Sequence, residues 1–346
     1  MKSTTVLVLL SLVFGLLLCE TILRASGYLR SRYLVPDRPF FVVDPDPRIG
    51  YSLKPGYRGN PTFFDFRQRE YRFPRVDYTV NTQGFRGPEW LPLDEGVFRI
   101  AVVGDSMAFG LGVEEGEAFP RILERDLNGW AVEKGIERRF RVYNLGVPGY
   151  NLEQEYFTWS RWGKILKPQM VIHVVYINDC EAQLHYALGT IVREFGQRFP
   201  SHLLFLANVL RTNIRSSPPG IREGTDLEAC QDYLKQFGEG AKAIGADYWG
   251  FVLVPVQYLK TLQGTDKEKI GRLNAFRRSM EGAFTASGGQ AQDVIEVLLG
   301  YPPYQFLIDP QDDHFNAKGH VVIADALKRK VIENYAATWR ESGQKS

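Results

Sequence analysis

The stretch Phe98-Arg-Ile-Ala-Val-Val103-Gly104-Asp105-Ser106 decides how the chain is organised. Its first part, Phe98–Val103, is a short and nearly continuous apolar run, which is typical of a strand buried in a parallel sheet. The glycine that follows permits a tight turn. Ser106 then stands at the carboxyl end of a strand, the edge where open α/β sheets bind ligands. The stretch therefore predicts a buried strand that presents a reactive serine.

The chain beyond this stretch alternates strand and helix patterns. Apolar residues at helical spacing over Glu117–Leu127 and a capping-box pattern at Asn151-Leu-Glu-Gln154 predict two helices. The alternation predicts a three-layer α/β/α sandwich, flavodoxin-like, around a mainly parallel five-stranded sheet. The expected strands are 98–103, 140–144, 170–177, 249–254 and 294–297. A last helix, expected from near Asn316, should bury Val321, Ala324, Leu327 and Val331.

Composition divides the chain into segments. The part before Phe98 is rich in proline, arginine and aromatic residues, so we expect an irregular extension with only short strands, such as Asp77–Asn81. A long insertion in the main domain carries an apolar stretch, Leu203–Val209, expected to be helical. The insertion either builds a wall of the substrate site or is a packing elaboration. The expected segments are a leader at 1–23, the extension at 24–97, the main domain at 98–335 with its insertion at about 181–240, and a polar tail at 336–346.

The leader has an apolar core from Val6 to Leu18 that carries no charged residue. A core of this length, preceded only by Lys2, is typical of a signal peptide, and it reaches the length of a membrane span if the helix continues through Leu23. We expect an uncleaved signal anchor, with the main domain on the periplasmic or cell-surface side of the membrane. The arginines that follow the leader favour the opposite orientation under the positive-inside rule.

Three other interpretations of the leader remain open. The small residues Ala25-Ser26-Gly27 suit cleavage of a secretory peptide, although they follow an arginine. Leu16–Cys19 is similar to a lipoprotein cleavage box, but Leu18 is bulky where that box needs a small residue. The third alternative is a buried N-terminal helix of a soluble domain.

The charge balance and the cysteines exclude several classes of partner. The chain has 42 basic and 40 acidic residues without a long run of either sign, so no nucleic-acid partner is expected. Cys19, Cys180 and Cys230 show no spacing typical of zinc ligands, and neither a metal nor a cofactor is expected. Cys180 and Cys230 can pair if this part of the chain is exported.

Asp309-Pro-Gln-Asp312-Asp313-His314 lies just before the last expected helix. A histidine with carboxylates nearby can be oriented through one ring nitrogen while the other faces a nucleophile, so His314 is the candidate general base. Asp312 is the favoured orienting acid, and Asp309 and Asp313 are the alternatives. Acidic residues at this place also suit helix capping, which is the competing structural interpretation.

Together with Gly104-Asp105-Ser106, three later segments make the chain resemble the SGNH hydrolases, or GDSL-like acylhydrolases. Asn144-Leu-Gly146-Val-Pro-Gly149-Tyr150 is similar to the second sequence block of that family, Asn178-Asp179 to the third, and Asp312-Asp313-His314-Phe-Asn316 to the fourth. The blocks occur in the order of the family. The segment Asn81–Gly87 also resembles one that precedes the first block in bacterial, membrane-associated members.

The resemblance implies a role for each matched residue. Ser106 would attack the ester carbonyl, His314 would take its proton and later activate water, and Asp312 would hold His314. The backbone N–H groups of Ser106 and Gly149, with the side-chain amide of Asn178, would form the oxyanion hole, where each donor typically stabilises the transition state by roughly 3–4 kcal/mol.

Two positions depart from the family pattern. Tyr176 stands where the third block usually has glycine, so its bulk either narrows the pocket or moves Asn178. The last block usually places the acid three residues before the histidine, where this chain has Gln311. The two-residue spacing of Asp312 occurs in some relatives.

The resemblance implies an ester hydrolase that acts through an acyl-enzyme, with acyl esters of extracytoplasmic glycans or lipids as substrates. An O-acyltransferase that modifies a polysaccharide needs the same serine and histidine and is the alternative. A non-catalytic binding protein with the same fold is a third interpretation, against which the intact Ser106, Asn178 and His314 argue. The other histidines carry less weight: His173 is expected in the core, His320 on the last helix, and His185 and His202 in the insertion.

Overall fold

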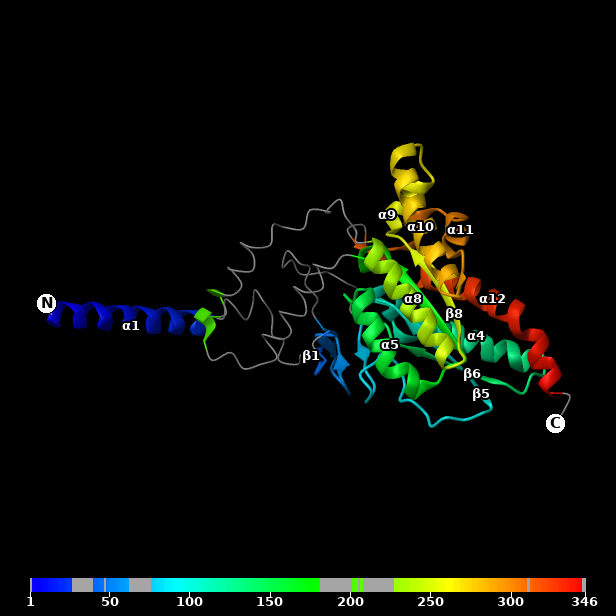
Figure 1. The fold of residues 1–346 in the computed structure, drawn as a ribbon, viewed down its shortest axis with the longest axis horizontal. Helices are drawn as coiled ribbons and strands as arrows, with labels where there is room; N and C mark the ends of the chain where they lie inside the picture. The colour runs from blue at the N-terminus through cyan, green and yellow to red at the C-terminus, as the bar shows by residue number, and fades with distance from the viewer. Residues whose placement is uncertain are drawn as a thin grey trace.

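The centre of the molecule is a five-stranded parallel sheet in the order β6-β5-β7-β8-β9 (Figure 1). Parallel pairing aligns Val102 of β5 with Asn144 of β6, and Val103 of β5 with His173 of β7. The strands are β5 (Val97–Val103), β6 (Arg139–Asn144), β7 (Met170–Tyr176), β8 (Asp247–Leu253) and β9 (Gln290–Ala291). The computed structural model describes residues 2–26, 40–46, 48–61, 76–180, 201–204, 206–207, 227–309 and 312–343.

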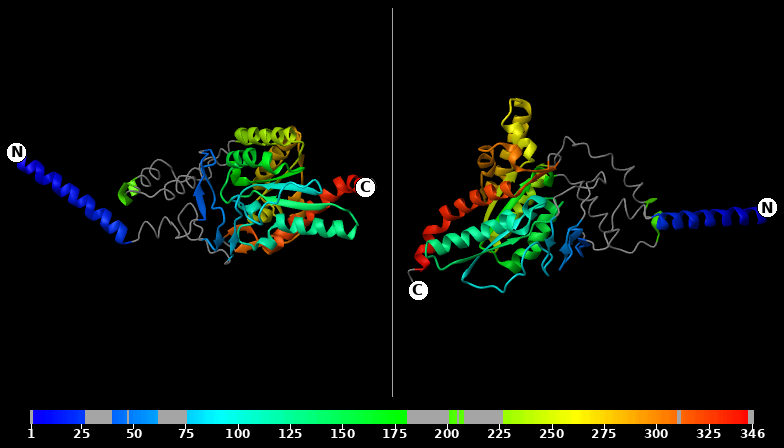
Figure 2. Two further views of the ribbon diagram at one scale, coloured as in Figure 1. Left: turned by 90° about the horizontal axis from the view of Figure 1, so that it is seen from below. Right: turned by 180° about the vertical axis from the view of Figure 1, so that it is seen from behind.

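Helices cover both faces of the sheet, which confirms the expected three-layer α/β/α sandwich (Figure 2). Every residue of β7 is buried, because a central strand between two helix layers has no side that faces solvent. In one layer α5 packs against α8, and α8 against α10; in the other, α12 packs against α4 and α11. The helices of the two layers are α5 (Leu152–Leu166), α8 (Leu227–Ala243) and α10 (Lys267–Ala286), and α4 (Phe119–Glu133), α11 (Val294–Leu299) and α12 (Ala317–Gly343).

Short elements gather at the carboxyl edge of the sheet. There α3 (Ser106–Phe109) follows β5, the 3-10 turn η2 (Ile177–Cys180) follows β7, and α9 (Val256–Leu262) follows β8. A hairpin contacts both α3 and α9 through its second strand, which brings it to the same edge. The hairpin is formed by β10 (Leu307–Asp309) and β11 (Asp312–Phe315), and the remaining 3-10 turns are η1 (Glu115–Glu117) and η3 (Pro303–Phe306).

The prediction of a fifth strand at 294–297 is wrong, because this segment begins α11. Asp293 accepts a hydrogen bond from the backbone N–H of Glu296 and so caps the helix. Val294, Ile295 and Leu298 are buried, a spacing that fits one face of a helix as well as a short strand. The fifth strand is instead the two-residue β9, just before this helix.

The C-terminal boundary also differs from the expected one. Helix α12 continues to Gly343, so residues 336–343 are helical and not a tail outside the domain. The reason is Trp339, which is buried against the rings of Phe98 and Phe140. The buried face of α12 includes Ala324, Leu327 and Val331 as predicted, whereas Val321 is 49% exposed.

The predicted insertion at about 181–240 is shorter than expected. Helix α8 begins at Leu227 and belongs to one of the layers on the sheet, with Leu234 and Phe237 fully buried. The insertion between the end of η2 and the start of α8 thus spans 181–226. Of this insertion the structure describes only 201–204 and 206–207, and 202–204 and 206–207 are helical. The expected helix at Leu203–Val209 is therefore only partly testable, and His185 lies outside the described residues.

The described part of the N-terminal extension contains two short antiparallel strand pairs and packs on the sheet domain. β1 (Phe41–Val43) pairs with β2 (Tyr51–Leu53), and β3 (Arg58–Gly59) pairs with β4 (Tyr78–Thr79). The hydroxyl of Tyr51 donates to the carbonyl of Pro148 at 2.9 Å, and the hydroxyl of Tyr150 donates back to the carbonyl of Tyr51. Both tyrosines are 1% exposed, so the contact is part of the shared core.

Arg86 of the extension is buried and anchors the segment that follows β5. Its guanidinium donates to the carbonyls of Phe109, Gly110 and Val113 at 3.0, 2.5 and 2.6 Å. It also lies over the ring of Tyr78, at 4.7 Å from the centroid. Burial lowers the pKa of Arg86 to about 10, so the guanidinium stays charged at neutral pH and its hydrogen bonds keep the strength of charged ones.

Helix α1 (Lys2–Ala25) lies apart from the sheet (Figure 1). Its window Thr4–Ala25 spans 22 residues with a mean hydropathy of 2.6 and no buried share, so by length and composition it can cross a bilayer. Near its end Glu20 accepts hydrogen bonds from the Ser201 hydroxyl and from the backbone N–H groups of His202 and Leu203. Part of the insertion is thus held against α1.

Candidate active site

The candidate nucleophile, Ser106, is the first residue of α3, three residues after β5 ends. Asp105 caps this short helix, because its Oδ1 accepts from the backbone N–H of Met107 at 2.8 Å. Ser106 is 8% exposed, so its hydroxyl is largely shielded from water. The strand and the capped turn fix where the hydroxyl points.

His314 of β11 meets Ser106 across 208 positions of sequence. Its Nε2 lies 2.8 Å from the Ser106 Oγ, within the reach of a hydrogen bond. Asp105 is a second acceptor for the same hydroxyl, with its Oδ2 at 3.2 Å. Burial raises the pKa of Asp105 above its usual range. This second partner was not predicted from the sequence. The feature that could have indicated it is the position of Asp105 directly before the serine, at the start of a helix.

Asp312 orients His314 through the other ring nitrogen. Its Oδ1 lies 2.6 Å from Nδ1 and also accepts from the His314 backbone N–H at 2.8 Å. Burial alone would raise the pKa of Asp312, but these hydrogen bonds and the charge of His314 outweigh it and hold the pKa below its usual range. With Nδ1–H donating to the carboxylate, Nε2 is left to accept the serine proton.

The other two candidate acids are placed differently. Asp309 lies on β10, paired with Asp312 across the hairpin. The backbone of Asp313 belongs to β11, while its side chain and Gln311 lie outside the described residues. Asp312 is thus the acid that the structure brings to Nδ1 of His314.

Helix capping, the competing role for these residues, falls to Asn316. Its Oδ1 accepts from the backbone N–H groups of Lys318 and Gly319 at the start of α12. Its Nδ2 donates to the carbonyls of Gln305 and Leu307, at 2.8 and 3.0 Å. The same side chain therefore caps the helix and anchors the hairpin, which fixes the position of His314.

The loop after β6 passes beside α3 and carries Gly149. A Cβ on Gly146 would lie 2.4 Å from the backbone nitrogen of Phe109, so only glycine allows the loop to approach this closely. Gly149 has a φ of 81°, in the left-handed region that favours glycine. The hydrogen bond from Tyr51 to Pro148 holds the loop from the side of the extension.

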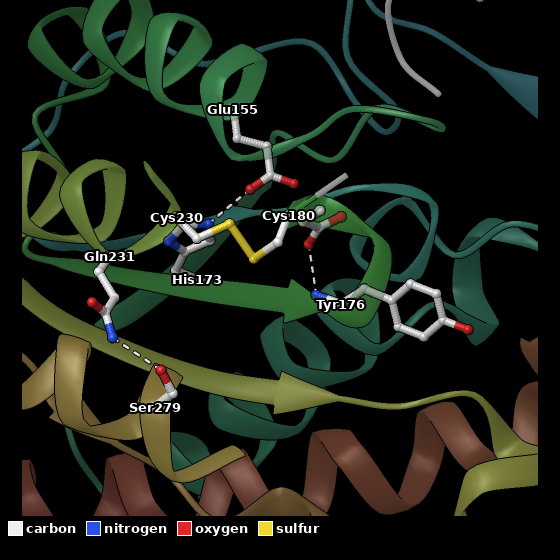
Figure 3. The surroundings of a disulfide bond; sticks show 8 residues. Glu155, His173, Tyr176, Cys180, Cys230, Gln231 and Ser279 are labelled. Atoms are coloured by element: carbon white, nitrogen blue, oxygen red, sulfur yellow. Dashed lines mark hydrogen bonds and ion pairs between the residues drawn. A yellow bond between two sulfur atoms is a disulfide. The ribbon is translucent and has the colours of Figure 1, made fainter. Parts of the chain in front are cut away.

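Asn178 lies on η2, the turn that follows β7. The turn is closed by Asp179, whose Oδ2 accepts from the backbone N–H of Tyr176 at 2.6 Å (Figure 3). Because β6, β5 and β7 are neighbours in a parallel sheet, Gly149, Ser106 and Asn178 all follow strand ends on one edge. The residues that the sequence motifs singled out are thus brought to a common edge.

Three titratable residues form a buried hydrogen-bonded row, of which Figure 3 shows Glu155 and His173. Glu155 Oε2 lies 2.8 Å from His173 Nε2, and His173 Nδ1 lies 2.8 Å from the Tyr248 hydroxyl. Burial lowers the pKa of His173 to about 3 and raises the pKa of Glu155 well above its usual value. A protonated Glu155 then donates to a neutral imidazole. His173 is a core residue with both nitrogens bonded, as predicted.

His320 is likewise a core residue. It is 2% exposed, and its Nδ1 accepts from the backbone N–H of Phe119 at 3.3 Å. Its ring stacks on the Phe119 ring with centroids 6.0 Å apart. Burial lowers its pKa to about 3, so it stays neutral and serves the packing of α12 on α4.

Cys180 and Cys230 form a disulfide that joins the end of η2 to α8 (Figure 3). The bridge connects residues 50 positions apart, and both cysteines are buried. It closes the base of the insertion, and Cys180 stands two positions after Asn178. The sequence left this pairing open.

We expect reduction of this disulfide to lower the free energy of unfolding by about 4 kcal/mol, the loop-closure contribution for a separation of 50 residues. Urea unfolding with and without a reductant measures the difference. Cys19→Ser is the matched control, because Cys19 is a free, exposed thiol on α1 and its loss should change nothing. Equal unfolding midpoints for oxidised and reduced protein would contradict the expectation.

No family model and no curated protein matches the chain. Solved structures that resemble it include an α/β hydrolase from the metagenome of Lake Arreo, Spain (19% identity, 66% of this chain and 93% of that chain, TM-score 0.44). A second is an acetylxylan esterase from Geobacillus stearothermophilus (15% identity, 68% of this chain and 94% of that chain, TM-score 0.44). A third is a psychrotrophic esterase from a Pseudoalteromonas species (12% identity, 68% of this chain and 97% of that chain, TM-score 0.42). With TM-scores below 0.5, these likenesses carry no argument about the reaction.

Proposed function

We propose that the protein is a serine ester hydrolase that acts through an acyl-enzyme on acyl esters. The observation that carries the proposal is the hydrogen-bonded row from Ser106 Oγ to His314 Nε2, at 2.8 Å, and from His314 Nδ1 to Asp312 Oδ1, at 2.6 Å. A hydroxyl is a weak nucleophile by itself, and it is activated by an adjacent base whose other nitrogen is held by a third group. The ordered SGNH-like sequence blocks support the same assignment.

In the proposed reaction, His314 Nε2 takes the Ser106 proton while Oγ forms a bond to the carbonyl carbon of the ester. The carbonyl electron pair moves to its oxygen, and the N–H groups of Ser106 and Gly149 with the amide of Asn178 stabilise that oxyanion. Collapse of the intermediate breaks the bond to the alcohol, which receives the proton from His314. Water, deprotonated by His314, then attacks the carbonyl carbon of the acyl-enzyme. The bond from Oγ to the acyl group breaks, His314 returns the proton to Oγ, and the acid is released.

Covalent labelling tests this proposal directly. A fluorophosphonate should modify the folded protein at Ser106, as located by mass spectrometry of the digested chain, because only an activated serine reacts at a useful rate. A folded protein that takes up no label at Ser106 would return the chain to the class of non-catalytic binding proteins.

Asn178→Ala should lower kcat for p-nitrophenyl acetate by about 10²–10³, the usual loss when one oxyanion donor is removed. The Michaelis constant should change little, because the donor acts mainly on the charge that develops in the transition state. Asn334→Ala is the control, since the Asn334 amide only donates to the carbonyl of Lys330 on the exposed surface of α12. An effect of Asn178→Ala confined to the Michaelis constant would contradict the assigned role.

We further propose that α1 anchors the protein in a membrane with the sheet domain on the extracytoplasmic side. The apolar length of α1 supports the anchor. The Cys180–Cys230 disulfide supports the orientation, because disulfides form and persist in oxidising compartments and are rare in the cytosol. Alkylation of free thiols in intact cells tests it: a mass increase at Cys180 or Cys230 without prior reduction would oppose export.

A further inference from the structure

A cavity of about 520 Å³ lies between the end of α9 and the segment that leads into η3. This volume falls in the range of roughly 300–1,000 Å³ that is usual for sites of small ligands. Its walls include the side chains of Lys260, Gln263, Tyr301 and Tyr304. The amide of Gln263 donates to the carbonyls of Leu299 and Tyr301, at 2.9 and 3.1 Å, so one wall is held by hydrogen bonds before any ligand arrives.

The walls present aromatic rings to solvent. Tyr304 is 74% exposed and Tyr301 is 44% exposed, although a tyrosine ring is large enough to gain much from burial. Lys260 is exposed as well and, among the described residues, forms no salt bridge. The cavity therefore combines ring faces with a cationic group, and none of its lining residues is acidic.

The elements that line the cavity adjoin the hairpin that carries His314, because α9 contacts β11 and η3 leads directly into β10. The Tyr301 ring lies 5.7 Å from the Phe306 ring, and the Phe306 ring lies 6.3 Å from that of Phe315, the residue after His314. The backbone N–H of Asn316 also donates to the carbonyl of Phe306 at 2.8 Å. These contacts pack η3, which borders the cavity, against the hairpin that carries His314.

We propose that this cavity is a subsite for sugar units of an acylated glycan whose ester is cleaved at Ser106. The inference rests on the proposed hydrolase function and narrows its substrate from glycans or lipids to glycans. A pyranose ring has apolar C–H faces that stack on tyrosine rings and hydroxyl groups that bind polar rims. A fatty acyl chain instead needs an enclosed apolar channel, whereas this cavity opens to solvent beside an ammonium group.

The test compares Tyr304→Ala with the wild-type protein on two esters of the same acyl group. The substrates are p-nitrophenyl acetate and O-acetylated cello-oligosaccharides. We expect the ratio of kcat/KM for the glycan ester to kcat/KM for the small ester to fall at least tenfold, mainly through a higher KM for the glycan. Tyr304→Phe, which keeps the ring, should retain most of the ratio. Val132→Ala, at an 83% exposed site on α4, should leave it unchanged.

An unchanged ratio in Tyr304→Ala would overturn the inference while the hydrolase function stands. A selective loss on a long-chain p-nitrophenyl ester would overturn it too, because the cavity would then serve an acyl chain. If the wild-type protein cleaves neither ester, calorimetry with unmodified cello-oligosaccharides still decides the subsite. Binding to Ser106→Ala that is lost when Tyr304→Ala is added supports it, and no binding to Ser106→Ala refutes it.

Discussion

Ser106→Ala should lower kcat for p-nitrophenyl acetate by about 10⁶-fold, the loss usual for the nucleophile of a serine hydrolase. The bond between Oγ and the acyl carbon cannot form without the hydroxyl that lies 2.8 Å from His314 Nε2. The folded state loses only one hydroxyl group, at a largely buried position. The midpoint of thermal unfolding should therefore move by a few degrees at most, and steady-state kinetics with calorimetry measure both effects.

Ser279→Ala is the matched control for this variant. Ser279 is half-buried on α10, and its hydroxyl accepts a hydrogen bond from the Gln231 amide at 2.9 Å. This hydrogen bond involves none of Ser106, His314 and Asp312. Its removal should change neither kcat nor the unfolding midpoint. Turnover by Ser106→Ala close to that of the wild-type protein would remove Ser106 from the mechanism.

Asp312→Asn should lower kcat by about 10⁴-fold, because an amide in place of the carboxylate can favour the wrong imidazole tautomer and cannot stabilise the imidazolium. The change also affects stability. The pKa of Asp312 is lower in the folded state than in the unfolded chain, where it is about 3.9. The ionised carboxylate therefore adds to the free energy of unfolding above the unfolded pKa, and this addition is lost as the pH falls through the lower folded pKa. The variant should lack this part of the acid-dependent loss of stability.

Asp313→Asn, at the next position on β11, is the comparison for Asp312→Asn. It should leave kcat within a small factor of the wild-type value, because Asp312 already occupies Nδ1 of His314. The reverse ranking of the two variants would transfer the orienting role to Asp313. Measuring both over the same pH range separates a loss of orientation from a simple shift of the pH optimum.

The architecture was predictable from the sequence because the central strands are almost wholly apolar. Phe98–Val103 and Met170–Tyr176 are buried on both faces, and each apolar run is interrupted by a single polar residue, Arg99 or His173. Prediction failed at the edge of the sheet, where β9 has only two residues and the next apolar residues, Val294–Leu298, form a helix. A short apolar run fits either structure, and tertiary packing decides between them.

The candidate site was predictable only in part. Ser106, His314 and Asp312 stand in recognisable local patterns, and the structure brings their side chains together. The supporting contacts have no such pattern. The hydrogen bonds of Arg86 go to backbone carbonyls. Because every residue has a carbonyl, the residue types of the sequence do not indicate these partners. The pairing of Tyr51 with Pro148 was hidden for the same reason.

The contacts of Arg86 have a practical consequence for shortening the chain. A fragment that starts at the first strand of the sheet would retain Ser106, His314 and Asp312 yet lose the donors for the carbonyls of Phe109, Gly110 and Val113. These carbonyls would then lose their charged donor beside the turn that carries the nucleophile, although Phe109 O still accepts from the Asn144 amide and Gly110 O from the backbone N–H of Val113. A soluble form of the protein without the apolar leader should therefore begin ahead of Phe40. A mutation of Arg86 that abolishes activity can act through the position of Ser106 and is not by itself evidence that Arg86 binds the substrate.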